Sequence, residues 1–294
     1  MSKILDGKLI SKQIKDELKF QVDNLIRSGK KVPHLAAIIV GNDGASLTYV
    51  SSKVKSCKKI GYNSSLIKLD EKISEQKLIN EINKLNQNSD VDGFIVQLPL
   101  PKHINEEKIL NQIKPSKDVD GFHPSNFGKM ALGLETFIPA TPYGIMEIFS
   151  RYNISLEGKI VVVLGRSNIV GKPISILMSN KGNPGNATVI LTHSKTNNLI
   201  NLTKQADVII SALGIPNFLK SEMIKKNCIV IDVGITRVEN PLKPKGYEIV
   251  GDVDFDNVIK KSSYITPVPG GVGPMTIAML LKNTMHAYIR KHHE

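Results

Sequence analysis

Apolar residues recur along the chain in two patterns, which predict alternating helices and strands. In residues 8–28 they are spaced three or four positions apart, and the run ends at Gly29, which is typical of an amphipathic helix with a glycine stop. Short continuous apolar runs such as 35–40 lie between turn residues and are typical of buried strands. By the same two patterns we expect helices at 46–60 and 74–85 and strands at 65–69 and 91–97.

A second series of elements begins near residues 141–142, where a proline suits the first turn of a helix. The patterns predict strands at 159–164, 188–191, 207–211 and 228–233, and helices at 142–152, from about 170, at 198–205 and at 274–291. This alternation of strands and helices is that of a dinucleotide-binding unit. Proline and glycine residues over 236–251 predict a hairpin or a loop.

These elements together predict an α/β fold with two domains. We expect a three-layer α/β domain over residues 1–140 and a Rossmann-type domain with a mainly parallel sheet over 141–273. The last helix, within 274–294, is expected to pack back on the first domain. The length of 294 residues is sufficient for two separate cores.

The chain carries a formal net charge of +12, which by itself suggests a polyanionic partner. Only five of the 39 basic residues are arginine, and aromatic residues make up 5% with no tryptophan. Arginine is the usual reader of guanine and aromatic rings stack on bases, so this composition argues against a nucleic-acid partner. A nucleic-acid binder remains an alternative supported by charge alone. Attraction for small anions such as nucleotide cofactors is the other interpretation.

Composition also bears on location and on metal chemistry. No stretch approaches the roughly 20 apolar residues of a membrane helix, and residues 1–7 lack the apolar core of a signal peptide. We therefore expect a cytoplasmic protein without a membrane partner. The two cysteines, Cys57 and Cys228, are too few for a disulfide framework or a cysteine zinc site, and no other ligand cluster indicates a metal.

Residues 160–173 contain a candidate nucleotide site. A buried strand at 160–164 is followed by Gly165, Arg166 and Ser167 and then by a helix, which is the context in which a Rossmann unit binds pyrophosphate. Ser167 stands where the dinucleotide fingerprint has its second glycine. A tight turn without a ligand therefore remains an alternative.

The end of the next strand, residues 193–196, indicates which dinucleotide is preferred. An acidic residue at this place selects NAD by binding the ribose. Here Ser194 and Lys195 supply a hydroxyl and a cation, and no carboxylate is present. This favours a ribose that carries a 2′-phosphate, and hence NADP. Arg166 could add a bidentate contact to that phosphate.

Three features of the first half of the chain could carry chemistry. Tyr49 and Lys53 are four residues apart on a predicted helix and share one face, although such pairs are common on solvated helices. Gln97 ends an apolar strand at the edge where open α/β sheets bind ligands, and a structural cap is an equal alternative. Asp118 and Asp120 precede a glycine and are compatible with a turn, a metal loop or recognition of a flat edge of N–H donors.

Taken together, these segments resemble the methylenetetrahydrofolate dehydrogenase/cyclohydrolase family. They occur in the family's order and cover nearly the whole chain, and only the loop around 181–186 looks longer. The matching segments are 46–53, 93–101, 118–121, 165–173, 193–196, 231–235 and 264–276.

The resemblance implies an enzyme with two activities. It would oxidise 5,10-methylenetetrahydrofolate to the methenyl form with NADP and then hydrolyse that cation to 10-formyltetrahydrofolate. In the implied roles, Lys53 activates groups at the reacting carbon and Gln97 holds Lys53 in place by a hydrogen bond. Tyr49 would stack on the folate rings, and Asp120 would accept hydrogen bonds from the pterin edge.

The resemblance also implies the cofactor and the partners. Gly165, Arg166, Ser167, Ser194 and the backbone of Ile235 would bind NADP, with Ile235 at the nicotinamide carboxamide. A homodimer joined through the nucleotide-binding domains is implied, as are polyglutamylated tetrahydrofolates as substrates. The alternative is another NADP-dependent two-domain dehydrogenase, acting on a small hydroxy acid or a shikimate-like ring. The polar residues of the first domain suit a folate better than a small acid.

Overall fold

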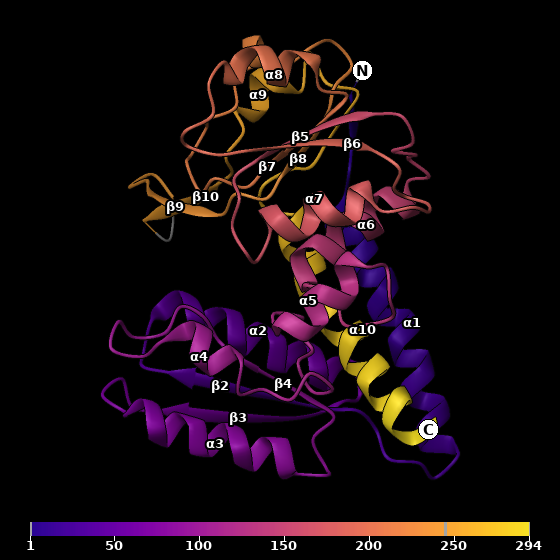
Figure 1. The fold of residues 1–294 in the computed structure, drawn as a ribbon, viewed down its shortest axis with the longest axis vertical. Coiled ribbons are helices and arrows are strands. Elements are labelled where there is room, and N and C mark those ends of the chain that lie inside the picture. Colours follow the sequence, from indigo (N-terminus) through magenta and orange to yellow (C-terminus); the bar gives the residue numbers. More distant parts are fainter. Residues whose placement is uncertain (1, 244–245, 294) are drawn as a thin grey trace. The chain divides into compact units, whose positions relative to one another are not determined.

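The computed structural model describes residues 2–243 and 246–293, and the chain divides into two compact units (Figure 1). Residues 12–140 and those from 277 onward form a unit that we call the three-stranded unit after its sheet. Residues up to 11 together with 141–276 form the other, which we call the six-stranded unit. The predicted fold class, α/β with two domains and mainly parallel pairing, is confirmed.

The three-stranded unit is built on a parallel sheet in the order β3-β2-β4. The strands are β2 (His34–Val40), β3 (Asn63–Leu69) and β4 (Gly93–Val96). Helices α2 (Gly44–Ile60) and α3 (Glu75–Gln87) lie on opposite faces of this sheet in Figure 1, which gives three layers. The central strand β2 is buried along almost its whole length, because helices cover both of its faces.

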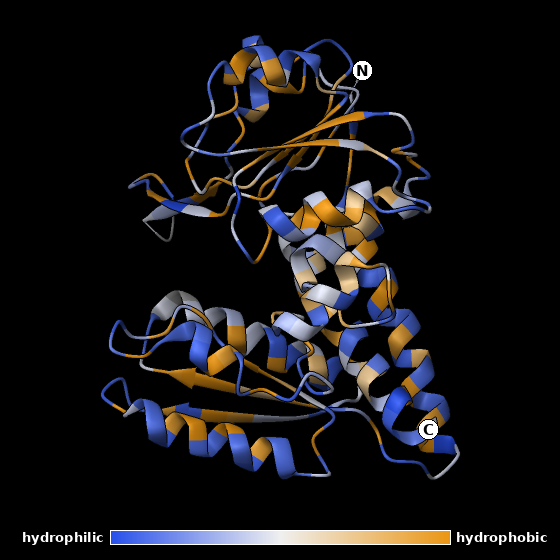
Figure 2. Cartoon of the chain, viewed as in Figure 1, coloured by the Kyte–Doolittle hydropathy of each residue, from blue (hydrophilic) through white to orange (hydrophobic). Residues whose placement is uncertain are grey.

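Helix α3 illustrates how the apolar pattern becomes a core. The Ser74 side chain accepts a hydrogen bond from the N–H of Lys77 and caps the start of the helix. Figure 2 shows strand β2 as mostly hydrophobic, whereas α3 presents hydrophobic and hydrophilic positions in turn along its length. The apolar face forms one buried cluster with residues of the sheet, among them Ile38 and Phe94. The buried residues of this face are Leu78, Ile79, Ile82 and Leu85.

Four further helices contribute to this unit. They are α1 (Gly7–Arg27), α4 (Glu106–Leu110), α5 (Pro124–Ala131) and α10 (Val272–His293). The part of α10 beyond residue 277 packs within the unit, where the Tyr62 hydroxyl donates to the carbonyl of Leu281 at 3.1 Å. The apolar pattern predicts α1 and α10 but not α4 and α5, which are too short to show a helical period.

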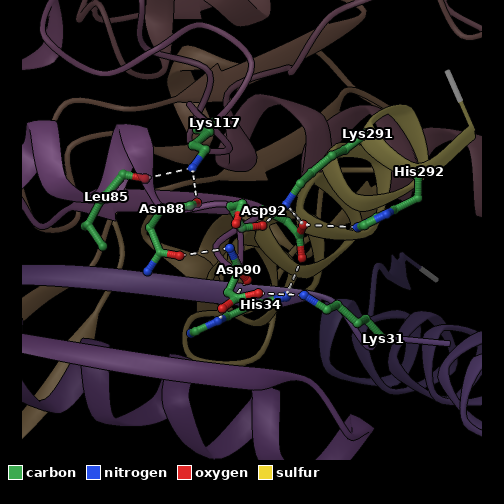
Figure 3. A network of polar contacts seen from close by, with 10 residues as sticks. Lys31, His34, Leu85, Asn88, Asp90, Asp92, Lys117, Lys291 and His292 are labelled. Atoms are coloured by element: carbon green, nitrogen blue, oxygen red, sulfur yellow. Dashed lines mark hydrogen bonds and ion pairs between the residues drawn. The ribbon is translucent and has the colours of Figure 1, made fainter.

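A polar network lies where strands β2 and β4 begin (Figure 3). The buried carboxylate of Asp92 accepts hydrogen bonds from the N–H of His34 at 2.8 Å and from Lys291 Nζ at 3.0 Å. Lys117 donates to two backbone carbonyls at the end of α3, and burial together with nearby lysines lowers the pKa of Lys117 to about 8. The network therefore ties the end of α10 to the amino edge of the sheet.

The six-stranded unit has an entirely parallel sheet in the order β1-β11-β8-β7-β5-β6. The four longer strands are β5 (Ile160–Leu164), β6 (Thr188–Thr192), β7 (Val208–Ser211) and β8 (Ile229–Asp232). The helices are α6 (Ala140–Arg151), α7 (Gly171–Ser179), α8 (Leu199–Gln205), α9 (Phe255–Val258) and the 3₁₀ helix η1 (Ser221–Met223). Strand β6 lies on one side of β5 and the later strands lie on the other. This reversal is the point at which open α/β sheets bind their ligands.

Two short strands of this sheet carry no signal in the apolar pattern. Strand β1 (Lys3–Ile4) pairs in parallel with β11 (Tyr264–Ile265), and each has only two residues. The sequence analysis placed residues 1–11 in the first domain, whereas the structure groups them with the six-stranded unit. The reason is that the pairing partner of β1 lies near the other end of the chain, where no local pattern can indicate it.

The segment at 236–250 is the antiparallel hairpin of β9 (Thr236–Glu239) and β10 (Tyr247–Val250). The Arg237 guanidinium lies 4.8 Å from the centroid of the Tyr247 ring, which links the two strands. Residues 244 and 245 of the predicted hairpin or loop lie outside the described residues.

In residues 2–243 and 246–293, no helix is long and apolar enough to cross a membrane. Within the same ranges, no group of three or more His, Cys, Asp or Glu side chains could hold a metal ion. Cys57 and Cys228 are buried free thiols, and burial raises the pKa of each to about 12. Both thiols are therefore protonated near neutral pH and have no nucleophilic character.

Candidate active site

Helix α2 (Gly44–Ile60) presents Tyr49 and Lys53 on one face near its middle. Asp43 begins the helix by accepting a hydrogen bond from the N–H of Ser46 at 2.7 Å. Lys53 is only 5% exposed, and its Nζ lies 4.5 Å from the centroid of the Tyr49 ring. The two residues are therefore not a solvent-exposed pair on the helix surface, because the ammonium is held against the face of an aromatic ring.

Gln97 follows β4 directly and completes the contact with Lys53. Its backbone N–H continues the sheet by donating to the carbonyl of Ile38 at 2.9 Å. Its side-chain Nε2 donates to the carbonyl of Leu98 at 2.7 Å, which orients the amide so that Oε1 accepts from Lys53 Nζ at 3.2 Å. Gln97 is thus more than a cap of the strand, since its side-chain oxygen is aimed at a buried amine.

Asp120 lies on a loop that is fixed on both sides. Residue 118 forms an isolated parallel bridge with Phe94, which attaches the loop to β4. Gly121 has φ +72°, and a Cβ there would lie 2.7 Å from the backbone N of Pro139. Only glycine satisfies both constraints, so the loop is held close to the segment around residue 139. Asp120 is partly buried as a result.

Lys53 and Asp120 influence each other through charge. Burial lowers the pKa of Lys53, and the Asp120 carboxylate opposes that shift. Burial likewise raises the pKa of Asp120, and the Lys53 ammonium opposes it. A buried amine with a lowered pKa holds its proton less tightly than an exposed lysine, and a general acid or base requires a shift in this direction.

The candidate nucleotide site lies at the carboxyl ends of β5, β6 and β8. Gly165 has φ +104°, and a Cβ there would lie 2.4 Å from the carbonyl oxygen of Ala212 after β7. A Cβ on Gly171 would lie 2.0 Å from the carbonyl oxygen of Gly165. The turn from β5 into α7 therefore requires both glycines, because its backbone closes on itself and on the loop after β7.

Ser167 and the start of α7 provide hydrogen-bonding groups at this turn. The Ser167 hydroxyl accepts from the N–H groups of Val170 and Gly171, each at 3.2 Å, and so caps the helix. The N–H groups of residues 166–169 make no hydrogen bond within the described part of the chain. Arg166 is exposed beside them. The turn thus offers several free donors and a guanidinium to an anion.

Ser194 and Ile235 lie on the loops that follow β6 and β8. In the first loop the N–H of His193 donates to the Thr196 hydroxyl at 2.9 Å, which leaves Ser194 and Lys195 exposed at the tip. Ile235 is 62% exposed although it is apolar. An exposed apolar residue at the carboxyl end of a parallel strand is available to a ligand.

The comparisons with known proteins bear on both halves of the chain. The family model for the catalytic domain of tetrahydrofolate dehydrogenase/cyclohydrolase matches residues 5–120, and the model for its NAD(P)-binding domain matches residues 139–292. The chain belongs to the tetrahydrofolate dehydrogenase/cyclohydrolase family.

Several relatives are similar over their full length. The bifunctional protein FolD of Flavobacterium johnsoniae is 63% identical over 97% of this chain and 96% of its own length. A solved structure of the bifunctional FolD enzyme from Campylobacter jejuni is 50% identical, covers 99% of both chains and has a TM-score of 0.92. The Trypanosoma brucei enzyme, whose structure is described as complexed with NADP cofactor and inhibitor, is 38% identical over 98% of both chains with a TM-score of 0.93.

In this dehydrogenase/cyclohydrolase, the turn after β5 fits a dinucleotide. Its glycines leave no room for side chains, and its free N–H groups and Arg166 suit phosphate oxygens. The loop at 193–196 carries no carboxylate that would repel a 2′-phosphate. The Ser167 hydroxyl accepts two hydrogen bonds in capping α7, and its O–H can still donate to a phosphate oxygen.

The sequence alone did not show which of the two acids, Asp118 or Asp120, holds the loop. Asp118 is 1% exposed, and its carboxylate accepts hydrogen bonds from the N–H groups of Phe122 and His123 and from Asn126 Nδ2. Burial raises the pKa of Asp118 to about 7. The two acids, which are two residues apart in the sequence, therefore have separate environments. Asp118 accepts hydrogen bonds from its own loop, whereas Asp120 interacts with Lys53. The glycine at 121 was the available signal, because a sharp turn needs such internal bonds.

Proposed function

We propose that this enzyme oxidises 5,10-methylenetetrahydrofolate to 5,10-methenyltetrahydrofolate with NADP and then hydrolyses the product to 10-formyltetrahydrofolate. The observation that carries the proposal is a buried lysine whose amine is held by neighbouring side chains. Lys53 Nζ is bound by Gln97 Oε1 at 3.2 Å, lies against the Tyr49 ring and interacts with the Asp120 carboxylate. Family membership supplies the class of reaction, and this geometry suits it.

NADP is the cofactor in this proposal, and its binding groups lie in the six-stranded unit. When bound, it supplies the ring carbon that accepts a hydride. Gly165 and Ser167 would admit the pyrophosphate to the start of α7, and Arg166 and Ser194 would bind the adenosine phosphate. The backbone of Ile235 would bind the nicotinamide carboxamide.

For the oxidation, the residues of the three-stranded unit need only orient the folate. The C–H bond of the methylene carbon breaks with its electron pair, and the product is a cation delocalised over N5 and N10. No proton is transferred at carbon, so positioning is the main contribution of the protein. Tyr49 would stack on the folate rings, and Asp120 would accept hydrogen bonds from the N–H edge of the pterin.

The hydrolysis requires a group that can exchange protons with water. Water attacks the cationic carbon, and the neutral Lys53 amine would take the proton that the water releases. The bond from that carbon to N5 then breaks as the carbinol oxygen becomes the formyl carbonyl. The proton held by Lys53 can pass to N5, and the proton of the carbinol hydroxyl is released to solvent. Burial favours the neutral amine, and the cationic folate beside it would favour it further. Gln97 would keep the amine at one position throughout.

The assembly and the location of the protein are part of the same proposal. We propose a homodimer joined through the six-stranded units and folates with polyglutamate tails as substrates, for which the net charge of +12 offers favourable long-range attraction. Light scattering behind a sizing column would show a dimer mass. We also propose a cytoplasmic location, as the composition led us to expect.

The first test is absorbance with methylenetetrahydrofolate and NADP, following NADPH and the methenyl product together. We expect NADPH to form with little accumulation of the methenyl compound in the parent protein. Lys53→Met keeps the length of the side chain without its amine, and we expect hydrolysis to fall by about 100-fold or more. NADPH binding should be unchanged, because the substitution lies in the other unit.

Lys55→Met is the matched control, since Lys55 lies on the same helix and is exposed. It should leave both activities at the parent level. Hydrolysis retained in Lys53→Met would contradict the role of Lys53. NADPH formation from a hydroxy acid or a shikimate-like alcohol, with none from methylenetetrahydrofolate, would overturn the proposed function and favour the other class of dehydrogenase.

A further inference from the structure

Two buried carboxylates of the six-stranded unit have no role in the assignments above. Asp232 is the last residue of β8, and Asp252 follows β10 by two positions. Asp232 is 3% exposed and Asp252 is fully buried. Carboxylates are rarely buried to this degree unless other groups satisfy them, so their contacts are informative.

Asp252 binds the loop that follows β7. Its Oδ2 accepts hydrogen bonds from the N–H of Leu213 at 2.6 Å and from the N–H of Gly214 at 3.1 Å. The hydroxyl of Ser211, the last residue of β7, lies 3.5 Å from the same oxygen. Hydrogen bonds to an ionised acceptor are strong, so one carboxylate oxygen holds the first residues after β7 in place.

Asp232 binds the loop that follows β8 and joins it to Asp252. Its Oδ1 accepts from the N–H groups of Gly234 and Asp252, both at 2.9 Å, and its Oδ2 accepts from the N–H of Val253 at 3.0 Å. The loops after β7 and β8 are therefore connected through these two acids. Ile235, the residue proposed at the nicotinamide carboxamide, directly follows Gly234.

The two acids fit against glycines in a reciprocal way. A Cβ on Gly234 would lie 2.3 Å from Asp252 Oδ1, and a Cβ on Gly251 would lie 1.9 Å from Asp232 Oδ2. Each carboxylate thus occupies the space of a side chain that the facing glycine lacks. Because of this packing, the segment 233–235 cannot move closer to Asp252.

One oxygen of this arrangement has no partner. Asp252 Oδ1 is buried and makes no hydrogen bond with any described residue. A buried carboxylate oxygen without a donor is unfavourable, and a native structure that keeps one invites a functional explanation. The loops that Asp252 holds lie at the carboxyl ends of strands, where a doubly wound sheet binds its dinucleotide.

We propose that Asp252 is a positioning residue for the dinucleotide, which holds the loops after β7 and β8 in the arrangement that binds NADP. The inference rests on the proposed function for the identity of the cofactor. Asp252 acts through Leu213, Gly214 and the segment beside Gly234, and it does not contact the reacting atoms. Its removal should therefore weaken dinucleotide binding and spare the folate chemistry.

The experiment compares Asp252→Ala and Asp252→Asn with the parent in two measurements. The first is the Kd of NADPH from its fluorescence, and the second is hydrolysis of methenyltetrahydrofolate without dinucleotide, which needs only residues of the three-stranded unit in our proposal. We expect Asp252→Ala to raise the Kd by about fivefold or more, because two hydrogen bonds to an ionised acceptor are lost. Hydrolysis should stay within about twofold, since no catalytic group moves.

Asp252→Asn is the conservative variant, because it keeps an oxygen for the N–H groups of Leu213 and Gly214. It should bind NADPH more weakly than the parent and more tightly than Asp252→Ala. Asp254→Asn makes the same change of charge two residues away, at a carboxylate that pairs with Lys220 on a partly exposed surface, and should leave the Kd unchanged.

Three results would overturn the inference. They are an NADPH Kd in Asp252→Ala within about twofold of the parent, a loss of hydrolysis in parallel with the loss of binding, and an equal effect of Asp254→Asn. If Asp252→Ala does not accumulate as folded protein, Asp252→Asn decides: weaker NADPH binding with hydrolysis retained supports the inference, and unchanged binding overturns it. A parent that neither binds NADPH nor forms it would instead overturn the proposed function, so the two failures are distinct.

Discussion

Lys53 is surrounded by groups that act on its charge in opposite directions. Burial favours the neutral amine, whereas the Asp120 carboxylate favours the ammonium. The Tyr49 ring face at 4.5 Å and the Gln97 oxygen at 3.2 Å also stabilise the ammonium. The protonation of this side chain is therefore set by a balance, which a bound cation or a single substitution can shift.

A substitution at Gln97 tests this balance. Gln97→Glu keeps the shape of the side chain and places a carboxylate against Lys53 Nζ. The added negative charge stabilises the ammonium and raises the pKa of Lys53, so the neutral amine appears only at higher pH. We expect the pH profile of methenyltetrahydrofolate hydrolysis to move to higher pH by about one unit or more. Stopped-flow absorbance at a series of pH values measures it.

The control for this change is Gln76→Glu on the exposed face of α3, which adds the same charge away from Lys53. Its pH profile should match that of the parent. A profile that does not move in Gln97→Glu, or that moves to lower pH, would show that Lys53 does not supply the proton exchange.

At the scale of elements, function is concentrated where strands end and helices begin. The turn from β5 to α7 closes so tightly that Gly165 and Gly171 have no space for a Cβ, and its N–H groups stay available to an anion. The loop after β6 is held by the bond between His193 and Thr196, which leaves its tip exposed. Strand pairing places these two loops next to each other, because β5 and β6 are neighbours in the sheet.

The choice between NADP and NAD should depend on the second of these loops. Ser194→Asp introduces a carboxylate at the exposed tip after β6, where it would repel a 2′-phosphate and accept a hydrogen bond from an unmodified ribose. We expect kcat/KM with NADP to fall by about tenfold or more, with a smaller loss or a gain for NAD. Steady-state assays with both dinucleotides measure the ratio.

Ser155→Asp serves as the comparison, because Ser155 is exposed ahead of β5, at the opposite edge of the same sheet. It should leave the cofactor preference unchanged. Equal losses with NADP and NAD in Ser194→Asp would indicate a damaged loop and would count against selection by charge at this position.

At the scale of the whole molecule, both ends of the chain take part in units formed mainly by other segments. Strand β1 pairs with β11 in the six-stranded sheet, and α10 ends in the three-stranded unit. Asn283 of α10 donates from Nδ2 to the carbonyls of Val119 at 2.8 Å and Ile138 at 2.9 Å. The C-terminal helix thus supports the loop that carries Asp120, far away in the sequence.

Removing this support should affect stability and folate binding together. Asn283→Ala leaves the buried carbonyl of Val119 and the partly buried carbonyl of Ile138 without this donor, and we expect the thermal midpoint to fall by about 4 °C or more. The KM for the folate should rise, because Asp120 directly follows Val119, whereas the Kd of NADPH should not change. Asn201→Ala on the exposed face of α8 is the control. A lower midpoint with an unchanged folate KM would limit Asn283 to a structural role.

Much of the architecture is predictable from the sequence because it depends on local patterns. Buried parallel strands are continuous apolar runs, and the long helices repeat apolar residues every three to four positions, so their order alone indicates two α/β domains. The glycines of the turn after β5 and the lack of a carboxylate at 193–196 can be read directly from the sequence. Tyr49 and Lys53 share a helical face by spacing alone.

The tertiary structure decided the roles of these residues, because their burial and their hydrogen-bond partners come from distant segments. Spacing cannot show that Lys53 is buried or that Gln97, 44 residues later, aims its oxygen at it. Nor can it separate Asp118 from Asp120, since only the packed loop gives one the backbone N–H groups and the other the lysine. The pairing of the short strands β1 and β11 likewise depends on contacts that form only with the sheet. The same holds for the carboxylates of Asp232 and Asp252, which join two loops.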